Sequence, residues 1–148
     1  MFKTKFLIAV VDDDQDDREL FIDVVKEIEN CLEILQFENG STFLNYLKKS
    51  KSDLPNLVFL DLNMPMMGGM QCLVRLREFV NAKELPVVIY STSSSTQYID
   101  EAYSLGANLY IPKPNDFNAL KRCVDSVLKM VLEEKMKIPT KETFLYTV

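Results

Sequence analysis

The sequence of 148 residues predicts an α/β protein with a doubly wound, five-stranded parallel sheet in the order 2-1-3-4-5. Short apolar runs alternate with helical patterns five times along the chain. This alternation is typical of parallel strands whose right-handed helical crossovers cover both faces of a sheet. The third apolar run ends directly at Asp61, as a buried strand does when it emerges at the sheet edge where α/β proteins bind ligands.

The first two strand–helix pairs are expected before residue 50. Residues 6–11 are all apolar and predict a buried strand, and residues 20–28 carry apolar side chains at helical spacing. Residues 33–37 have mixed polarity, as an edge strand does. Residues 43–47 predict a short helix, and the Asn-Gly-Ser sequence at 39–41 predicts the turn and cap before it.

Three more strand–helix pairs continue the pattern. They are expected at residues 57–60 (strand), 72–80 (helix), 87–90 (strand), 99–105 (helix), 108–111 (strand) and 117–132 (helix). Gly106 is placed to end the fourth helix. We expect residues 1–136 to form one domain and residues 137–148 to form a C-terminal tail, with no separate output domain.

Composition and charge exclude several classes of protein. The net charge of −5 and the pI of about 4.8 argue against unaided binding to nucleic acid or to an anionic membrane. The apolar run at residues 6–11 is too short for a signal peptide or a membrane span. Three scattered cysteines without a CxxC motif indicate a reducing compartment and apolar packing, so we expect a cytoplasmic protein.

The chain has no histidine, which removes histidine bases, histidine-ligated zinc and phosphohistidine from its own chemistry. Its four glycines make no phosphate-binding loop of a known pattern. Any chemistry must therefore use carboxylates, hydroxyls, lysine and a hard metal ion.

Such groups follow four of the predicted strands. Asp12 and Asp13 follow the first strand, Asp61 the third, Ser91 the fourth and Lys113 the fifth. In the order 2-1-3-4-5 these strands are neighbours, so the side chains converge on one crevice at the switch between strands one and three. Three carboxylates in one crevice repel each other, so the pKa of at least one should rise unless a cation binds. An oxygen-only ligand set suits Mg²⁺, and a metal beside a nucleophilic carboxylate suits phosphoryl transfer.

These residues also carry a family resemblance. The motifs are Val10-Val11-Asp12-Asp13, Leu60-Asp61-Leu62-Asn63-Met64-Pro65 with Gly69, Ser91, and Tyr110 with Lys113-Pro114. In combination they resemble the signature of the receiver domain of bacterial two-component response regulators, similar to the chemotaxis regulator, over residues 5–135. The resemblance implies a flavodoxin-like receiver fold that acts as a single-domain response regulator in a phosphorelay.

The resemblance implies a role for each site residue. Asp61 would be the phosphoacceptor, and a histidine kinase or histidine phosphotransfer protein would be the donor. Mg²⁺ would be held by the Asp13 and Asp61 side chains and the Asn63 backbone carbonyl, with Asp12 helping through water. Lys113 would be the site lysine, followed by a cis peptide bond before Pro114. Ser91 and Tyr110 would be the switch residues.

The sequence departs from the family pattern at two positions. Gly68 stands where the family often has an acidic residue before the loop glycine, which removes no catalytic group. Ser93, two residues beyond Ser91, is small and neutral, and the resemblance implies that this position bears on the lifetime of the phosphorylated state.

Two alternatives belong to other functional classes. An aspartyl-phosphate phosphohydrolase would also use Asp61, but it commonly needs a second carboxylate two residues on, where this chain has Asn63. A receiver-like scaffold that is not phosphorylated would be expected had Asp61, Asp13 or Lys113 been lost, and none has been.

We therefore expect a signalling protein and not an enzyme, with self-phosphorylation and self-dephosphorylation as its only chemistry. Phosphorylation would draw Ser91 toward the phosphoryl group and turn Tyr110 inward. The face made by residues 97–105, 108–111 and 117–132, with Tyr98 and Tyr103, would then dock a downstream target or a second copy as a homodimer.

Overall fold

The computed structural model describes residues 6–28, 32–49, 54–81, 84–133 and 141–146. Its strands are β1 (Phe6–Val11), β2 (Leu32–Phe37), β3 (Leu57–Leu60), β4 (Val87–Ser91) and β5 (Leu109–Pro112). Its helices are α1 (Gln15–Ile28), α2 (Gly40–Lys49), α3 (Gly69–Arg77), α4 (Thr96–Ser104), α5 (Phe117–Leu132) and α6 (Lys141–Phe144). The strands are parallel and ordered β2-β1-β3-β4-β5, which confirms the predicted fold class.

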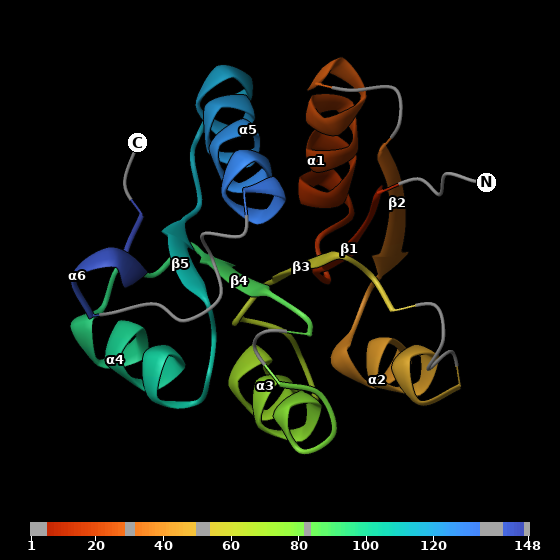
Figure 1. The fold of residues 1–148 in the computed structure, drawn as a ribbon, viewed down its shortest axis with the longest axis vertical. Coiled ribbons are helices and arrows are strands. Elements are labelled where there is room, and N and C mark those ends of the chain that lie inside the picture. Colours follow the sequence, from red (N-terminus) through yellow and green to blue (C-terminus); the bar gives the residue numbers. More distant parts are fainter. Residues whose placement is uncertain (1–5, 29–31, 50–53, 82–83, 134–140, 147–148) are drawn as a thin grey trace.

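The sheet lies between two layers of helices (Figure 1), and an apolar cluster fills each side. Helices α1 and α5 cover one face, and α2, α3 and α4 cover the other. Alternate residues of β1 serve the two layers, because Ile8 and Val10 pack toward α1 and α5 while Ala9 and Val11 pack toward the other three helices. The β3 and β4 strands are buried along their whole length, as expected of central parallel strands.

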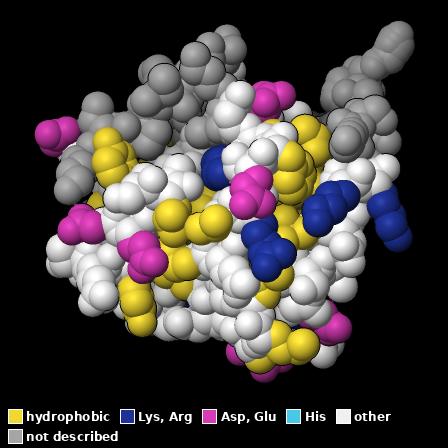
Figure 2. Space-filling view, turned by 90° about the horizontal axis from the view of Figure 1, so that it is seen from below, with side chains coloured by type: hydrophobic (Ala, Val, Ile, Leu, Met, Phe, Trp, Pro, Cys, Tyr) yellow, Lys and Arg dark blue, Asp and Glu magenta, His cyan; other side chains and the backbone are white. Residues whose placement is uncertain are grey.

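The outer surface of α2, α3 and α4 is mixed in character. Figure 2 shows hydrophobic side chains on this side of the molecule interspersed with Lys, Arg, Asp and Glu. Phe79 and Val74 are among the apolar residues that stay partly exposed, each by 41%. None of the described helices is long and apolar enough to cross a membrane.

The helix that follows the central strand ends earlier than predicted. The sequence predicted it to reach residue 80, but α3 ends at Arg77. The backbone N–H groups of Phe79 and Val80 both donate to the Leu76 carbonyl, so the chain closes into a turn there. The Arg77 guanidinium stabilises this turn by donating to the carbonyl oxygens of Val80 and Leu85, at 3.3 and 2.9 Å. The helical spacing of apolar residues does not reveal that a polar side chain of the helix bonds to the segment that follows it.

Three further expectations concern single residues. The expected cis peptide bond before Pro114 is wrong, because no described residue follows a cis peptide bond; the trans form is the lower-energy state of X–Pro bonds. Asn39 caps α2 as predicted, since its Oδ1 accepts from the Thr42 N–H at 2.9 Å. Cys72 and Cys123 are buried free thiols, as predicted, and Cys31 lies outside the described residues.

Candidate functional site

Three carboxylates meet at the carboxyl ends of β1 and β3. The backbone fixes two of them, because the Asp12 N–H donates to the Phe37 carbonyl at 3.0 Å and the Asp61 N–H donates to the Val11 carbonyl at 2.9 Å. One carboxylate oxygen from each of Asp12, Asp13 and Asp61 lies within 4.8 Å of the other two. Asp12 and Asp61 are buried, and Asp13 is exposed to solvent. The predicted convergence of these residues is therefore confirmed.

Lys113 brings a positive charge to the same place. Its backbone N–H donates to the Ser91 carbonyl at 2.7 Å, which sets the lysine at the end of β4. Its Nζ lies 3.0 Å from Asp12 Oδ2, 2.8 Å from Asp17 Oδ2 and 3.5 Å from Asp61 Oδ1. The lysine side chain is 11% exposed, so these ion pairs are poorly screened by water.

The charges of this crevice shift the pKa values of its groups. Burial raises the pKa of the Asp61 carboxyl from its ordinary 3.8 to about 7; Lys113 opposes this rise and Asp12 adds to it. Burial alone would lower the pKa of Lys113, but its bonds to Asp17 and Asp12 outweigh burial and raise it. The lysine therefore stays charged, and Asp61 is a carboxylate whose ionised form is short of compensating positive charge.

The donor set fits a hard divalent cation. All three clustered groups are carboxylates, two of them buried, and Asp61 would be relieved of repulsion by added positive charge. Mg²⁺ and similar ions prefer such oxygen ligands and keep part of their water shell, which the exposed side of Asp13 allows. The cluster could therefore bind a metal ion.

The two predicted switch residues lie on the neighbouring strands β4 and β5. The buried Ser91 Oγ accepts from the Ser93 N–H at 3.1 Å. Tyr110 is also fully buried, and its hydroxyl donates to the Ser93 carbonyl at 2.8 Å. Tyr110 thus already occupies the inward position, which the sequence predicted it to take only after phosphorylation. Both residues are bonded to the backbone of Ser93 in the loop after β4.

Comparison with known proteins identifies this arrangement. The family model of the response regulator receiver domain matches residues 8–125. The chain belongs to this family. The receiver is 30% identical over 125 residues to the probable methanogenesis regulatory protein FilR2 of Methanothrix harundinacea, covering 82% of this chain and 81% of FilR2. It is 28% identical over 131 residues to response regulator Rcp1 of Synechocystis, covering 86% of this chain and 89% of Rcp1.

Solved structures agree with this assignment. The phosphorylated cyanobacterial phytochrome response regulator RcpA superposes with a TM-score of 0.79 at 26% identity, covering 88% of this chain and 96% of RcpA. The Mn²⁺-bound form of Rcp1 superposes with a TM-score of 0.74 at 26% identity, covering 90% of this chain and 99% of that one. The protein is a receiver domain of two-component response regulators, and its carboxylate cluster is typical of their phosphoacceptor site.

Two residues of the receiver site were missed in the sequence. The Tyr90 hydroxyl donates to Asp12 Oδ2 at 3.2 Å, and Lys113 Nζ lies 4.7 Å from the centre of the Tyr90 ring. Asp17, in the first turn of α1, pairs with Lys113 as described, and no sequence motif pointed to this pair. A tyrosine inside an otherwise aliphatic central strand is the signal that could have pointed to Tyr90, because a buried hydroxyl needs a partner.

The loop between β3 and α3 explains the glycine of the receiver motif. A Cβ on Gly69 would lie 2.7 Å from the Leu62 Cα and would collide with the Asp61 carbonyl oxygen. The Gly69 N–H donates to the Leu62 carbonyl at 3.0 Å, so the chain folds back on itself directly after Asp61. Gly68 precedes α3 as its N-cap residue, with no side chain to cap the helix.

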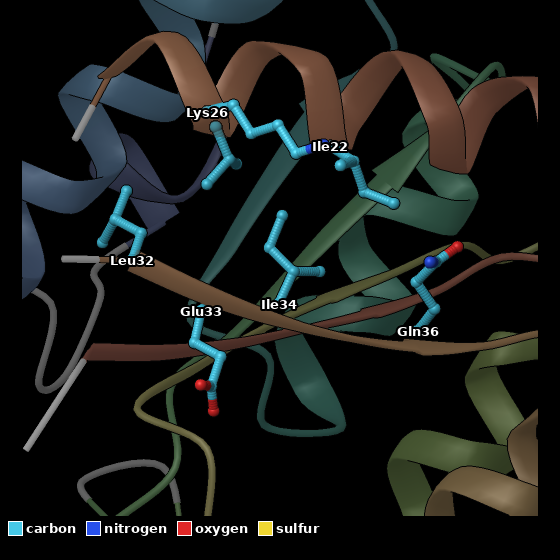
Figure 3. Close-up of a pocket in the computed structure, with 7 residues that line it drawn as sticks. Ile22, Lys26, Leu32, Glu33, Ile34 and Gln36 are labelled. Atoms are coloured by element: carbon cyan, nitrogen blue, oxygen red, sulfur yellow. The ribbon is translucent and has the colours of Figure 1, made fainter. Parts of the chain in front are cut away.

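A pocket of about 560 Å³ lies elsewhere, between α1 and β2 (Figure 3). It is lined by Ile22, Val25, Lys26, Leu32, Glu33, Ile34 and Gln36. Leu32, Ile34 and Gln36 point toward α1, and Glu33 points away from it. None of these residues belongs to the carboxylate cluster, so this pocket is separate from the receiver site.

Proposed function

We propose that this receiver accepts a phosphoryl group on Asp61 from the phosphohistidine of a histidine kinase or histidine phosphotransfer protein. The observation that carries the proposal is the position of Asp61, which lies beside Asp12 and Asp13 and 3.5 Å from Lys113. A buried carboxylate between two acidic groups and one lysine can react as a nucleophile while the lysine offsets the new negative charge.

In the transfer, an Asp61 carboxylate oxygen forms a bond to phosphorus as the bond between phosphorus and the donor imidazole breaks. The imidazole keeps the electron pair and takes up a proton from water. Lys113 would pair with an oxygen of the arriving phosphoryl group. Asp12, Asp13, Asp61 and the Asn63 carbonyl would hold Mg²⁺, which when bound neutralises the negative charge of the carboxylates and phosphoryl oxygens.

The new charge would act on the two switch residues. Ser91 would leave the Ser93 N–H for a phosphoryl oxygen, and Tyr110 would hold its inward position. The altered face of α4, β5 and α5 would dock a downstream target protein or a second copy. In this proposal residues 1–136 are the receiver, residues 137–148 are a tail, and the protein works in the cytoplasm without nucleic acid, membrane or separate enzymatic substrate.

The first test is intact mass after incubation with Mg²⁺ and acetyl phosphate. We expect one added phosphoryl group, lost in Asp61→Asn and in the presence of a chelator. Asp23→Asn is a matched control, because Asp23 is an exposed aspartate on α1 and should leave the gain unchanged. A gain that persists in Asp61→Asn would overturn the assignment of the acceptor.

A second donor separates the proposal from the scaffold alternative. If acetyl phosphate gives no gain, the same measurement with a phosphorylated histidine kinase decides between a kinase-dependent receiver and a scaffold. Absence of a gain with both donors would favour the scaffold. No observation favours a phosphohydrolase, because the position of its second carboxylate is occupied by the amide of Asn63.

A further inference from the structure

The C-terminal residues 141–146 pack on the face that we propose for docking. Helix α6 lies beside β5 and close to α4 (Figure 1). After α6 the chain forms an isolated parallel bridge in which Leu145 pairs with Tyr110 of β5. The Tyr146 N–H donates to the Tyr110 carbonyl at 2.9 Å. Since β5 is an edge strand of the sheet, these residues occupy a place where another strand could add.

Phe144 anchors this segment. Its side chain is 1% exposed and joins the core on the α2–α3–α4 side of the sheet. Its ring centre lies 5.3 Å from that of Tyr103 on α4 and 6.3 Å from that of Tyr110 on β5. Tyr146 packs against the core on the opposite side of the sheet, while Leu145 between them is 41% exposed. Two aromatic residues of the segment, Phe144 and Tyr146, therefore pack on opposite faces of the sheet at the β5 edge.

A buried aromatic anchor and a backbone bond to an edge strand are the two elements of strand-addition recognition. The backbone contact supplies affinity for any extended peptide, and the ring contacts with Tyr103 and Tyr110 select an aromatic side chain. A partner that used the same edge and pocket could not bind while residues 141–146 are in place.

We propose that the groove between α4 and β5 is a peptide-docking site, which residues 141–146 occupy in cis. The partner that fits it is an extended segment with an aromatic residue in the position of Phe144, followed by backbone that pairs with β5. The tail thus competes with the partner, and the affinity of the face for a partner depends on how tightly the tail is held.

Tyr110 links this groove to the carboxylate site. Its hydroxyl bonds to Ser93 in the loop after β4, its carbonyl bonds to Tyr146, and its ring faces Phe144. A movement of Ser91 and Ser93 would therefore reach the tail through one side chain. This link rests on the proposed function, whereas occupancy of the groove in cis does not.

The test uses the protein of residues 1–148 and a fluorescent peptide with the sequence of residues 141–148. We expect the peptide to bind the double variant Phe144→Ala, Tyr146→Pro at least ten-fold more tightly than the wild type, because its own tail no longer competes. The matched control is Leu145→Ala, which alters the exposed residue and should bind as weakly as the wild type. A peptide with alanine in place of Phe144 should not bind the double variant.

Hydrogen exchange gives a second measurement on the same proteins. We expect faster exchange over residues 109–112 in Tyr146→Pro, which retains Phe144 but loses the donor to Tyr110, and wild-type exchange in Leu145→Ala. Equal peptide affinity for wild type and double variant, or unchanged exchange in Tyr146→Pro, would overturn occupancy in cis.

The same peptide tests the link to phosphorylation. Wild-type protein treated with Mg²⁺ and acetyl phosphate should bind the peptide several-fold more tightly, and Asp61→Asn should not respond. If mass spectrometry shows phosphorylation without a change in affinity, the link through Tyr110 is wrong although Asp61 is the acceptor. If Asp61 gains no phosphoryl group, the proposed function fails while the binding and exchange results still decide occupancy in cis.

Discussion

The Nζ atom of Lys113 lies 3.5 Å from Oδ1 of Asp61, and Asp12 and Asp17 hold the same nitrogen at 3.0 and 2.8 Å. The lysine is therefore fixed by two carboxylates beside a third. Because the lysine is closer to Asp12 and Asp17 than to Asp61, it compensates the charge of Asp61 only in part, and burial still raises the pKa of Asp61.

Replacing Lys113 with alanine should slow phosphorylation by acetyl phosphate by about 100-fold, the usual cost of losing one charged donor at a site of developing charge. The initial rate by intact mass measures this. Lys121→Ala is the control, because Lys121 pairs with Glu27 on the surface at 3.2 Å. A rate for Lys113→Ala equal to that of the control would contradict a role in transfer.

Replacing Tyr90 with phenylalanine should lower the free energy of unfolding by about 1.5–3 kcal/mol, the typical contribution of a hydrogen bond to a charged group. The ring would remain packed with Phe21 and Phe59, at centre distances of 6.0 and 6.2 Å, so the loss isolates the bond to Asp12. Urea denaturation measures it. Tyr98→Phe changes a tyrosine that is 39% exposed and should cost far less; equal losses would show that the Tyr90 bond contributes nothing.

Metal-free protein should lose stability as the pH rises from about 4 to about 7. Burial raises the pKa of Asp61 from 3.8 to about 7, so over this interval the unfolded chain has ionised Asp61 while the folded chain still holds its proton. Unfolding then releases a proton, and rising pH favours it. Above this interval the contribution of Asp61 is constant. Urea midpoints in EDTA across the pH range, compared with Asp61→Asn, isolate the effect, and parallel curves for the two proteins would refute it.

The two adjacent glycines after β3 should respond differently to alanine. Gly69→Ala should destabilise the protein strongly and distort the loop beside Asp61, because the added Cβ meets backbone atoms of Leu62 and Asp61. Gly68→Ala should be nearly neutral, since the nearest atom to its Cβ is the Leu62 carbonyl oxygen at 3.4 Å. Thermal midpoints of the two variants test this. Similar midpoints would mean that the close approach at Gly69 does not constrain the residue.

Most of the fold and the centre of the site could be predicted from the sequence. Apolar runs and helical spacing located the strands, and parallel topology then required Asp12, Asp61 and Ser91 to meet at one sheet edge. The alternation of strand and helix patterns could not show which side chains form hydrogen bonds from one element to another. Arg77 shortened a helix by bonding beyond it, and Tyr90 looked like core because only its hydroxyl leaves the apolar layer.

The C-terminal segment shows a second limit of predicting structure from this sequence. An aromatic-rich segment after Pro139 has the same composition whether it packs on its own domain or extends away from it. The contacts of Phe144 with Tyr103 and Tyr110 depend on which groove the folded domain leaves open, and that is a property of the tertiary structure.

The position of Tyr90 also makes the site accessible to near-ultraviolet spectroscopy. The chain has six tyrosines and no tryptophan, so tyrosine dominates its near-ultraviolet absorption. Tyr90 is the tyrosine whose hydroxyl bonds to Asp12 and whose ring lies under Lys113, so a cation or phosphoryl group that arrives there alters the electric field on this ring. Near-ultraviolet circular dichroism of the wild type, minus that of Tyr90→Phe, would follow occupancy of the crevice in real time without any attached label.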